Sequence, residues 1–294
     1  MGPRDSNMLS PLLLDASKRL KDNGFLLRLI ATKGLAGVDS HPGYSLRINS
    51  FGTLKLWRGK EEISDKEWQR EKALELFLLL FVNRGRSLHK EQLYYYLWPD
   101  ADEETASRNF KVSLNALRNA LEPERKPRQQ GFFITKNRFN YGFNEKSGYY
   151  FDAEEFEHLI ELGDRQQEKR TQIELYRNAI ELHQGDFMSD ILYIEWISDE
   201  RERLKNIFLS TVDRLAEYYY EIEDNEEALK MADLLLQNDP CWEPAYLLKM
   251  KIYNRLNQRF LALKVYQRCK TVLDRELNVL PMPEIEKYYK RLTS

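Results

Sequence analysis

The sequence predicts a mainly α protein with a small antiparallel β component, divided into two parts of different pattern. Apolar and polar residues alternate near 44–63 and 132–144, which is typical of strands. Elsewhere in 44–151, and throughout 152–294, apolar residues recur every three or four positions, which indicates helices. Residues 1–151 carry 25 Lys and Arg against 18 Asp and Glu, whereas 152–294 carry 20 against 29. This asymmetry indicates that only the first part meets a polyanion such as DNA.

The composition is ordinary for a soluble, helix-rich protein. Of the 294 residues, 42% are hydrophobic and 31% charged. No apolar run approaches the roughly 18 residues that a membrane span needs, and the first residues do not resemble a secretory signal. Cys241 and Cys269 lie in helical apolar patterns and are expected to be core thiols rather than a disulfide. We therefore expect a cytoplasmic, nucleoid-associated protein without membrane contact.

Residues 1–43 are predicted to form an N-terminal helical extension and linker. Apolar residues between 8 and 33 fit one or two short helices, and the stretch 34–43 is rich in Gly and contains Pro. This segment is too short to bury a core of its own. We expect it to be an appendage or the tail of something longer.

Residues 44–151 follow the element order of a winged helix. A small sheet comes first, and Ser64 or Asp65 can cap the helix that follows it. Two β-rich runs around a polar turn at 136–139 then predict a hairpin, the wing. Between the sheet and the hairpin the period predicts three helices, at about 67–83, 90–98 and 104–121.

The third predicted helix, 104–121, has two distinct faces at 100° per residue. Its apolar stripe consists of Phe110, Leu114, Leu117 and Leu121. About 120° round the helix lies a second stripe of Arg108, Lys111, Asn115 and Arg118. Long cations and an amide can bond phosphates and base edges in the major groove. The candidate DNA contacts on this helix are Arg108, Lys111, Val112, Asn115, Arg118 and Asn119.

Further polar side chains lie where a winged helix would meet DNA. The wing tip carries Lys136, Asn137 and Arg138, which are candidates for the adjacent minor groove or the backbone. Helix ends could meet phosphates through Arg84, Arg86 and Lys90. We expect binding to weaken steeply with salt, because cations on phosphates release counterions from DNA.

Residues 152–294 are predicted to form an all-α, tetratricopeptide-like repeat domain. Ala216, Tyr219 and Ala228 recur 34 positions later as Met250, Tyr253 and Ala262, which is the period of such repeats. Stacked helix pairs of this kind share a core and leave a concave surface for partners. The predicted helices are 154–162, 167–183, 195–221, 226–237, 243–256, 260–273 and 284–292.

Short motifs connect both parts to a known family. Trp98-Pro99-Asp100 precedes the third helix and Leu117-Arg118-Asn119-Ala120-Leu121 ends it. With these motifs, residues 46–151 resemble the OmpR-type winged helix-turn-helix of SARP-type activators. The rest resembles the bacterial transcriptional activator domain. Its matching stretches are 152–157, 185–187, 195–196, 200–204, 225–229, 263–266 and 277–279. His41-Pro42-Gly43-Tyr44-Ser45-Leu46-Arg47 resembles a joint in larger ATPase and helical-repeat regulators, of which the chain would be the C-terminal part.

The resemblance implies a transcriptional activator that binds double-stranded promoter DNA. Helix 104–121 would enter the major groove and the wing, 132–144, would lie on the adjacent minor groove or backbone. An acidic loop before the helix would contact RNA polymerase through Asp100, Asp102 and Glu103. The family also implies direct repeats in the DNA and a homodimer on it, and the sequence identifies no small effector.

The sequence gives little support for an enzymatic function. It has no G-x-x-x-x-G-K phosphate loop, no His pair at metal-ligand spacing, and no Cys or His near either cysteine. We therefore expect no cofactor and no metal. The remaining alternative is a tetratricopeptide-type adaptor whose winged helix binds protein, but the basic stripe on 104–121 favours DNA.

Overall fold

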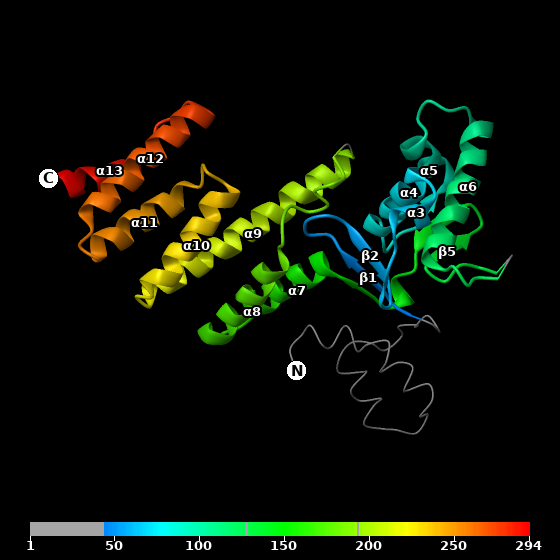
Figure 1. Ribbon diagram of the computed structural model, residues 1–294, viewed down its shortest axis with the longest axis horizontal. Coiled ribbons are helices and arrows are strands. Elements are labelled where there is room, and N and C mark those ends of the chain that lie inside the picture. The colour runs from blue at the N-terminus through cyan, green and yellow to red at the C-terminus, as the bar shows by residue number, and fades with distance from the viewer. Residues whose placement is uncertain (1–43, 127–128, 193) are drawn as a thin grey trace, which may run out of the picture. The chain divides into compact units, whose positions relative to one another are not determined.

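A computed structural model describes residues 44–126, 129–192 and 194–294 (Figure 1). The helices predicted between 8 and 33 lie outside the described residues. The described chain forms two compact units. Unit 1 contains residues 44–49 and 55–151, and unit 2 contains 50–54 and 152–294.

Unit 1 begins with a four-stranded sheet in the order β3-β2-β1-β7. Strand β1 pairs antiparallel with β2 and parallel with β7, so that Leu46 faces both Arg58 and Tyr149. The parallel strand is absent from the sequence prediction, because three residues are too few to show a period. The strands are β1 (Leu46–Asn49), β2 (Lys55–Arg58), β3 (Glu61–Glu62) and β7 (Tyr149–Phe151).

The prediction of a single helix at 67–83 is wrong, because the structure contains two helices, α3 and α4, in and around this range. Ser64 and Glu67 form a reciprocal capping box at the start of α3 (Asp65–Trp68), and Trp68 is buried. The backbone then turns at Gln69, whose φ of 60° is left-handed. The long helix starts afresh after this turn as α4 (Glu71–Val82). The next two helices agree closely with the prediction: α5 (Lys90–Leu97) and α6 (Glu103–Leu121).

The wing is a tighter hairpin than the sequence predicts. Residues 136 and 137 continue the first strand, so only Arg138 and Phe139 form the turn. A third short strand pairs with the second wing strand and joins the wing to the start of α5. The wing sheet has the order β4-β6-β5, with β4 (Leu88–His89), β5 (Ile134–Asn137) and β6 (Asn140–Phe143).

Unit 2 is built from helices that pack as consecutive pairs, α7 with α8, α9 with α10 and α11 with α12 (Figure 1). Ala216, Ala228 and Ala262 are fully buried, which lets the helices approach closely. This is the predicted repeat architecture. Cys269 is buried as predicted, but Cys241 is only half-buried. The helices are α7 (Asp152–Asp164), α8 (Lys169–Leu182), α9 (Glu195–Glu221), α10 (Asn225–Asn238), α11 (Glu243–Arg255), α12 (Arg259–Leu277) and α13 (Pro283–Thr293).

Residues 50–54 belong to unit 2 although they connect β1 to β2. The carboxylate of Asp152 accepts hydrogen bonds from the backbone N–H of Ser50 at 2.7 Å and of Phe51 at 3.0 Å. The ring of Phe51 contacts those of Phe156 and His183, with centroids 5.2 and 4.8 Å away. Burial raises the pKa of the Asp152 carboxyl, and the hydrogen bonds that it accepts oppose this rise.

Candidate nucleic-acid interface

Helix α6 is held in unit 1 by a broad buried face. Phe110, Leu114, Leu117 and Leu121 are all buried, which confirms the predicted apolar stripe. Four small residues widen this face, because the backbone of α6 lies close to α3 and α4. Alanine and serine give little signal in an apolar pattern, so the sequence does not reveal them. They are Ala106, Ser113, Ala116 and Ala120.

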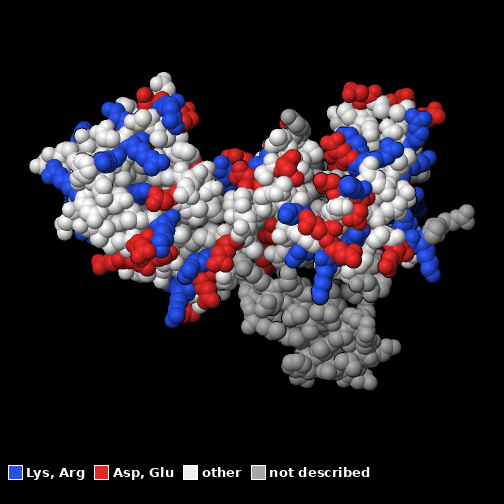
Figure 2. Space-filling view, in the orientation of Figure 1, with Lys and Arg blue, Asp and Glu red and all other residues white. Residues whose placement is uncertain are grey.

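The opposite side of α6 is an exposed stripe of mixed polar character. Arg108 and Lys111 form no ion pair among the residues that the structure describes. They line a shallow surface hollow together with Glu104 and Val112. Figure 2 shows Lys and Arg side chains along the outer edge of α6, and Asp and Glu side chains over the loop between α5 and α6. The exposed members of the predicted contact set are Arg108, Lys111, Val112, Asn115 and Asn119.

Arg118 is the one residue of that set that the structure separates from the exposed stripe. Its guanidinium is half-buried near Glu122 and Gly131, and its Nε has no hydrogen-bond partner among the described residues. Burial lowers the pKa of Arg118. A helical projection does not predict the burial of Arg118, because the residues that cover it come from the loop after the helix.

Both ends of α6 are fixed by side chains that satisfy its terminal backbone groups. At the N-terminus, Asp102 accepts a hydrogen bond from Thr105 N at 2.7 Å, and this bond lowers the pKa of the Asp102 carboxyl. At the C-terminus, Arg58 Nη1 donates to the carbonyl oxygen of Ala120 at 2.8 Å. The guanidinium of Arg58 also binds Glu67. A buried cation at this end suits the helix dipole.

Glu122 ties the end of α6 to the start of the wing. Its buried Oε1 accepts hydrogen bonds from the backbone N–H of Phe132 at 2.9 Å and of Phe133 at 3.2 Å. The sequence does not reveal this role, because the amides that Glu122 binds lie ten and eleven positions further along the chain. The structure gives it a positioning role, because it fixes the wing relative to α6.

The wing tip is joined to the start of α5. Lys136, Asn137 and Arg138 are exposed, and Arg138 has a left-handed φ of 54°. Phe139 is 60% exposed, and its carbonyl oxygen accepts a hydrogen bond from Lys90 N at 2.9 Å. The Lys90 ammonium lies 5.4 Å from the centre of the Phe139 ring. Lys90 therefore lies beside the predicted wing contacts.

The other two predicted phosphate contacts have partners within unit 1. Arg84 Nη1 donates to the carbonyl oxygen of Phe81 at 3.2 Å, and its guanidinium lies 5.2 Å from the Phe151 ring. Arg86 Nε donates to Asn83 Oδ1 at 2.9 Å. Arg84 therefore stacks on the aromatic core and Arg86 closes the turn after α4.

All three predicted acidic residues are exposed, Asp100 and Asp102 in the loop between α5 and α6 and Glu103 as the first residue of α6. Asp102 also caps α6, so its carboxylate has a structural role that the sequence prediction missed. Two tyrosines of α5 lie close to this loop in sequence, with Tyr95 73% and Tyr96 56% exposed. Tyrosine is enriched at protein interfaces.

The C-terminal half of the chain matches a known family. Residues 151–293 match the family model of the bacterial transcriptional activator domain. These residues are a bacterial transcriptional activator domain. With the winged helix before it, the chain has the domain arrangement of SARP-type activators.

One curated protein and one solved structure are similar to this chain. Regulatory protein AfsR of Streptomyces griseus is 23% identical over 84% of this chain, which spans about a quarter (24%) of the length of that curated relative. The structure of Mycobacterium tuberculosis EmbR, solved with a low affinity phosphopeptide, superposes with a TM-score of 0.67. That match is 16% identical and covers 84% of this chain and 65% of EmbR, and it shows a shared fold.

The described residues contain neither a membrane-spanning helix nor a cluster of metal ligands. None of the helices within the described residues is long and apolar enough to span a membrane. In the same residues, no group of three His, Cys, Asp or Glu side chains is placed to hold a metal ion.

Proposed function

We propose that this chain is a sequence-specific DNA-binding transcriptional regulator whose helix α6 enters the major groove. The observation that carries this proposal is the exposed stripe of Arg108, Lys111, Val112, Asn115 and Asn119 on a helix whose opposite side is buried and whose ends are both capped. A major groove about 12 Å wide admits a helix presented in this way. Arg and Lys can bind guanine, Asn can bind adenine, and Val can touch a thymine methyl.

The wing is proposed to bind the adjacent minor groove or the backbone. Lys136, Asn137 and Arg138 are exposed on or beside the turn, and the Lys90 bond to Phe139 fixes this tip relative to α5. Lys90 is the best placed of the predicted phosphate contacts, since Arg84 and Arg86 already have partners. Arg118 is proposed to support the wing base rather than to read a base.

Binding to duplex DNA recovered by genomic selection tests this proposal. Lys111→Ala or Asn115→Ala should each weaken specific binding by about 1–3 kcal/mol if the side chain contacts a base edge. The matched control is Lys60→Ala, which removes an exposed cation from the β2–β3 turn of the same unit and should leave affinity unchanged. Unchanged affinity in both α6 variants, measured by fluorescence anisotropy, would exclude α6 as the reading helix.

The partners implied by the SARP-type arrangement are promoter DNA, with direct repeats and a homodimer on it, and RNA polymerase. The polymerase contact is proposed for the loop between α5 and α6 together with the first residue of α6, where Asp100, Asp102 and Glu103 are exposed. An activator needs a surface that faces away from DNA, and a carboxylate-rich loop suits this role because phosphates repel it.

Isosteric substitutions separate this contact from DNA binding. In a chain with Asp100→Asn, transcription in vitro should fall while DNA affinity stays constant, because Asp100 does not line the hollow that Glu103 shares with Arg108. Asp102→Asn is the companion variant, because asparagine also caps a helix and so removes charge but not the cap. Loss of DNA binding together with transcription in these variants would refute a separate polymerase surface.

A further inference from the structure

An acidic side chain, Glu104, lies in line with the exposed stripe of α6. At 100° per residue, Glu104 lies about 20° round the helix from both Lys111 and Asn115. It is exposed, and it lines the same surface hollow as Arg108 and Lys111. Helical period therefore places a carboxylate near the centre of the face that is proposed to enter the major groove.

The N-terminus of α6 does not depend on this carboxylate. Asp102 caps the helix through its hydrogen bond from Thr105 N, and Glu103 already supplies a negative charge in the first turn. Glu103 lies about 100° round the helix from Glu104, away from the centre of the stripe. A further acid on the DNA-facing side weakens binding, because phosphates repel it. A partner in the groove would offset this repulsion.

Glu104 makes no ion pair or side-chain hydrogen bond in the part of the chain that the structure describes. Arg108 lies four positions further along, a spacing at which opposite charges can pair on a helix. On α10, Lys230 makes such pairs with Glu226 and Glu227. Glu104 and Arg108 form no such pair. The carboxylate of Glu104 is therefore free to accept hydrogen bonds from another molecule.

Cytosine is the base that a carboxylate matches in the major groove. An ionised carboxylate only accepts hydrogen bonds. Cytosine presents its N4 amino group as a donor there, whereas guanine presents two acceptors and thymine an acceptor and a methyl group. Adenine presents its donor beside an acceptor, which repels a carboxylate. The other side chains of the stripe suit guanine, adenine and thymine.

We propose that Glu104 is a specificity-determining residue of α6 that accepts a hydrogen bond from the N4 amino group of a cytosine. This inference rests on the proposed entry of α6 into the major groove. At any other base the carboxylate loses water and gains no donor, which is unfavourable. Glu104 therefore acts mainly against sites that lack this cytosine, and it lowers the affinity for DNA in general.

Selection of bound sites from a random-sequence duplex library, with the full chain, tests this assignment. The wild type should prefer cytosine at one position of the site by about tenfold over the other bases. Glu104→Ala should lose this preference alone and bind random-sequence duplex at least as tightly as the wild type, because an anion is removed. Glu104→Gln should shift the preference at this position to adenine, since a carboxamide both donates and accepts.

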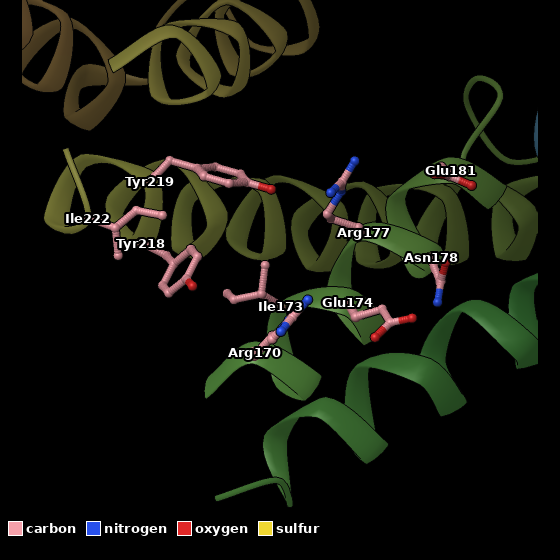
Figure 3. A pocket seen from close by; sticks show the side chains of 9 residues that line it. All are labelled: Arg170, Ile173, Glu174, Arg177, Asn178, Glu181, Tyr218, Tyr219 and Ile222. Carbon is pink, nitrogen blue, oxygen red and sulfur yellow. The ribbon is translucent and has the colours of Figure 1, made fainter. Parts of the chain in front are cut away.

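The matched control is Glu174→Gln in unit 2. Glu174 is also an exposed glutamate, and it lines a groove between α8 and the end of α9 together with Arg170 and Arg177 (Figure 3). The substitution makes the same change of charge beside arginines, but outside α6. Its base preferences should equal those of the wild type at every position.

Wild-type preferences in both Glu104 variants would overturn the assignment. So would a general loss of affinity for random-sequence duplex in both, because this would indicate a structural role. If Lys111→Ala and Asn115→Ala weaken specific binding while the Glu104 variants keep the wild-type preferences, α6 still enters the groove and only the cytosine contact is wrong. A wild-type chain that selects no sequence would overturn both proposals.

Discussion

His183 shows how burial decides the charge state of a single side chain. It lies at the C-terminal end of α8, where the helix dipole favours a cation. Its ring, however, stacks on Phe208 at a centroid distance of 3.9 Å and contacts Phe51. Burial prevails and lowers the pKa of His183 to about 4, with a smaller opposing effect from Asp186. The folded protein therefore holds this imidazole neutral.

We predict that His183 destabilises unit 2 as the pH falls from about 6.5 to about 4. In this window the unfolded chain binds a proton that the folded chain does not. The stabilisation is complete above the ordinary pKa of 6.5 and is lost as the pH approaches the folded value. The shift limits the loss to about 3 kcal/mol. Urea unfolding across this pH range should show this loss of unfolding free energy in the wild type. The loss should be absent from His183→Phe, which keeps a ring and cannot titrate.

The matched control is His158→Gln, which removes an exposed histidine from α7. Urea unfolding of this variant over the same pH range controls for the loss of a histidine as such. Asp152 acts in the opposite sense, since its raised pKa means that stability falls as the pH rises above the ordinary aspartate value. The difference between the wild type and His183→Phe isolates the histidine. Equal slopes in the two chains would contradict the prediction.

At the scale of elements, the orientation of the wing depends on one carboxylate. Glu122 is buried, and its Oε1 accepts two backbone hydrogen bonds at the start of the hairpin. We predict that Glu122→Ala lowers the free energy of unfolding of unit 1 by about 1–3 kcal/mol, because two N–H groups lose their acceptor. Hydrogen exchange at the Phe132 and Phe133 amides should accelerate more than at the amides of α4.

Glu124→Ala provides the control for this variant, since Glu124 lies in the same loop but is exposed. It should change stability by less than about 0.5 kcal/mol. If the two variants have equal free energies of unfolding, the loop tolerates the loss of Glu122, and another contact must orient the wing.

The elements that the sequence predicts well are those whose signal is local and long. Helix α6 spans five turns of regular apolar period, and its boundaries agree with the prediction within one residue. The same holds for α9, which matches the predicted range. The break at Gln69 escapes prediction because a left-handed residue other than glycine or asparagine gives no local signal.

The candidate site is predictable only in part, for the same reason. The exposed stripe of α6 follows from helical period, because its partner would be outside the chain. The residues that position α6 cannot be predicted from helical period, because their partners are remote in sequence. Arg58 donates a hydrogen bond to the carbonyl oxygen of Ala120, 62 positions away, and no sequence pattern near Arg58 predicts this bond.

At the scale of the whole molecule, the chain cannot be divided at one point. It leaves unit 1 after Asn49, contributes residues 50–54 to unit 2, and returns to unit 1 at Lys55. Within unit 2 this short segment is well anchored, because Met188 N donates to Ser50 O at 2.7 Å and Gly52 N donates to Asp186 O at 3.0 Å. A residue that the strand pattern assigns to the sheet can therefore belong to the helical core.

Phe51 makes this arrangement testable. Its side chain is 5% exposed and packs on Phe156, and its backbone forms an antiparallel β-bridge with Phe187. We predict that Phe51→Ala destabilises unit 2 by about 3–5 kcal/mol, because it empties a filled site in the helical core. Hydrogen exchange should rise across α7, α8 and the start of α9 and remain low in α4 and α6. Phe139→Ala, at an exposed ring, should change neither unit's exchange, whereas increased exchange of α4 and α6 in Phe51→Ala would place Phe51 energetically in unit 1.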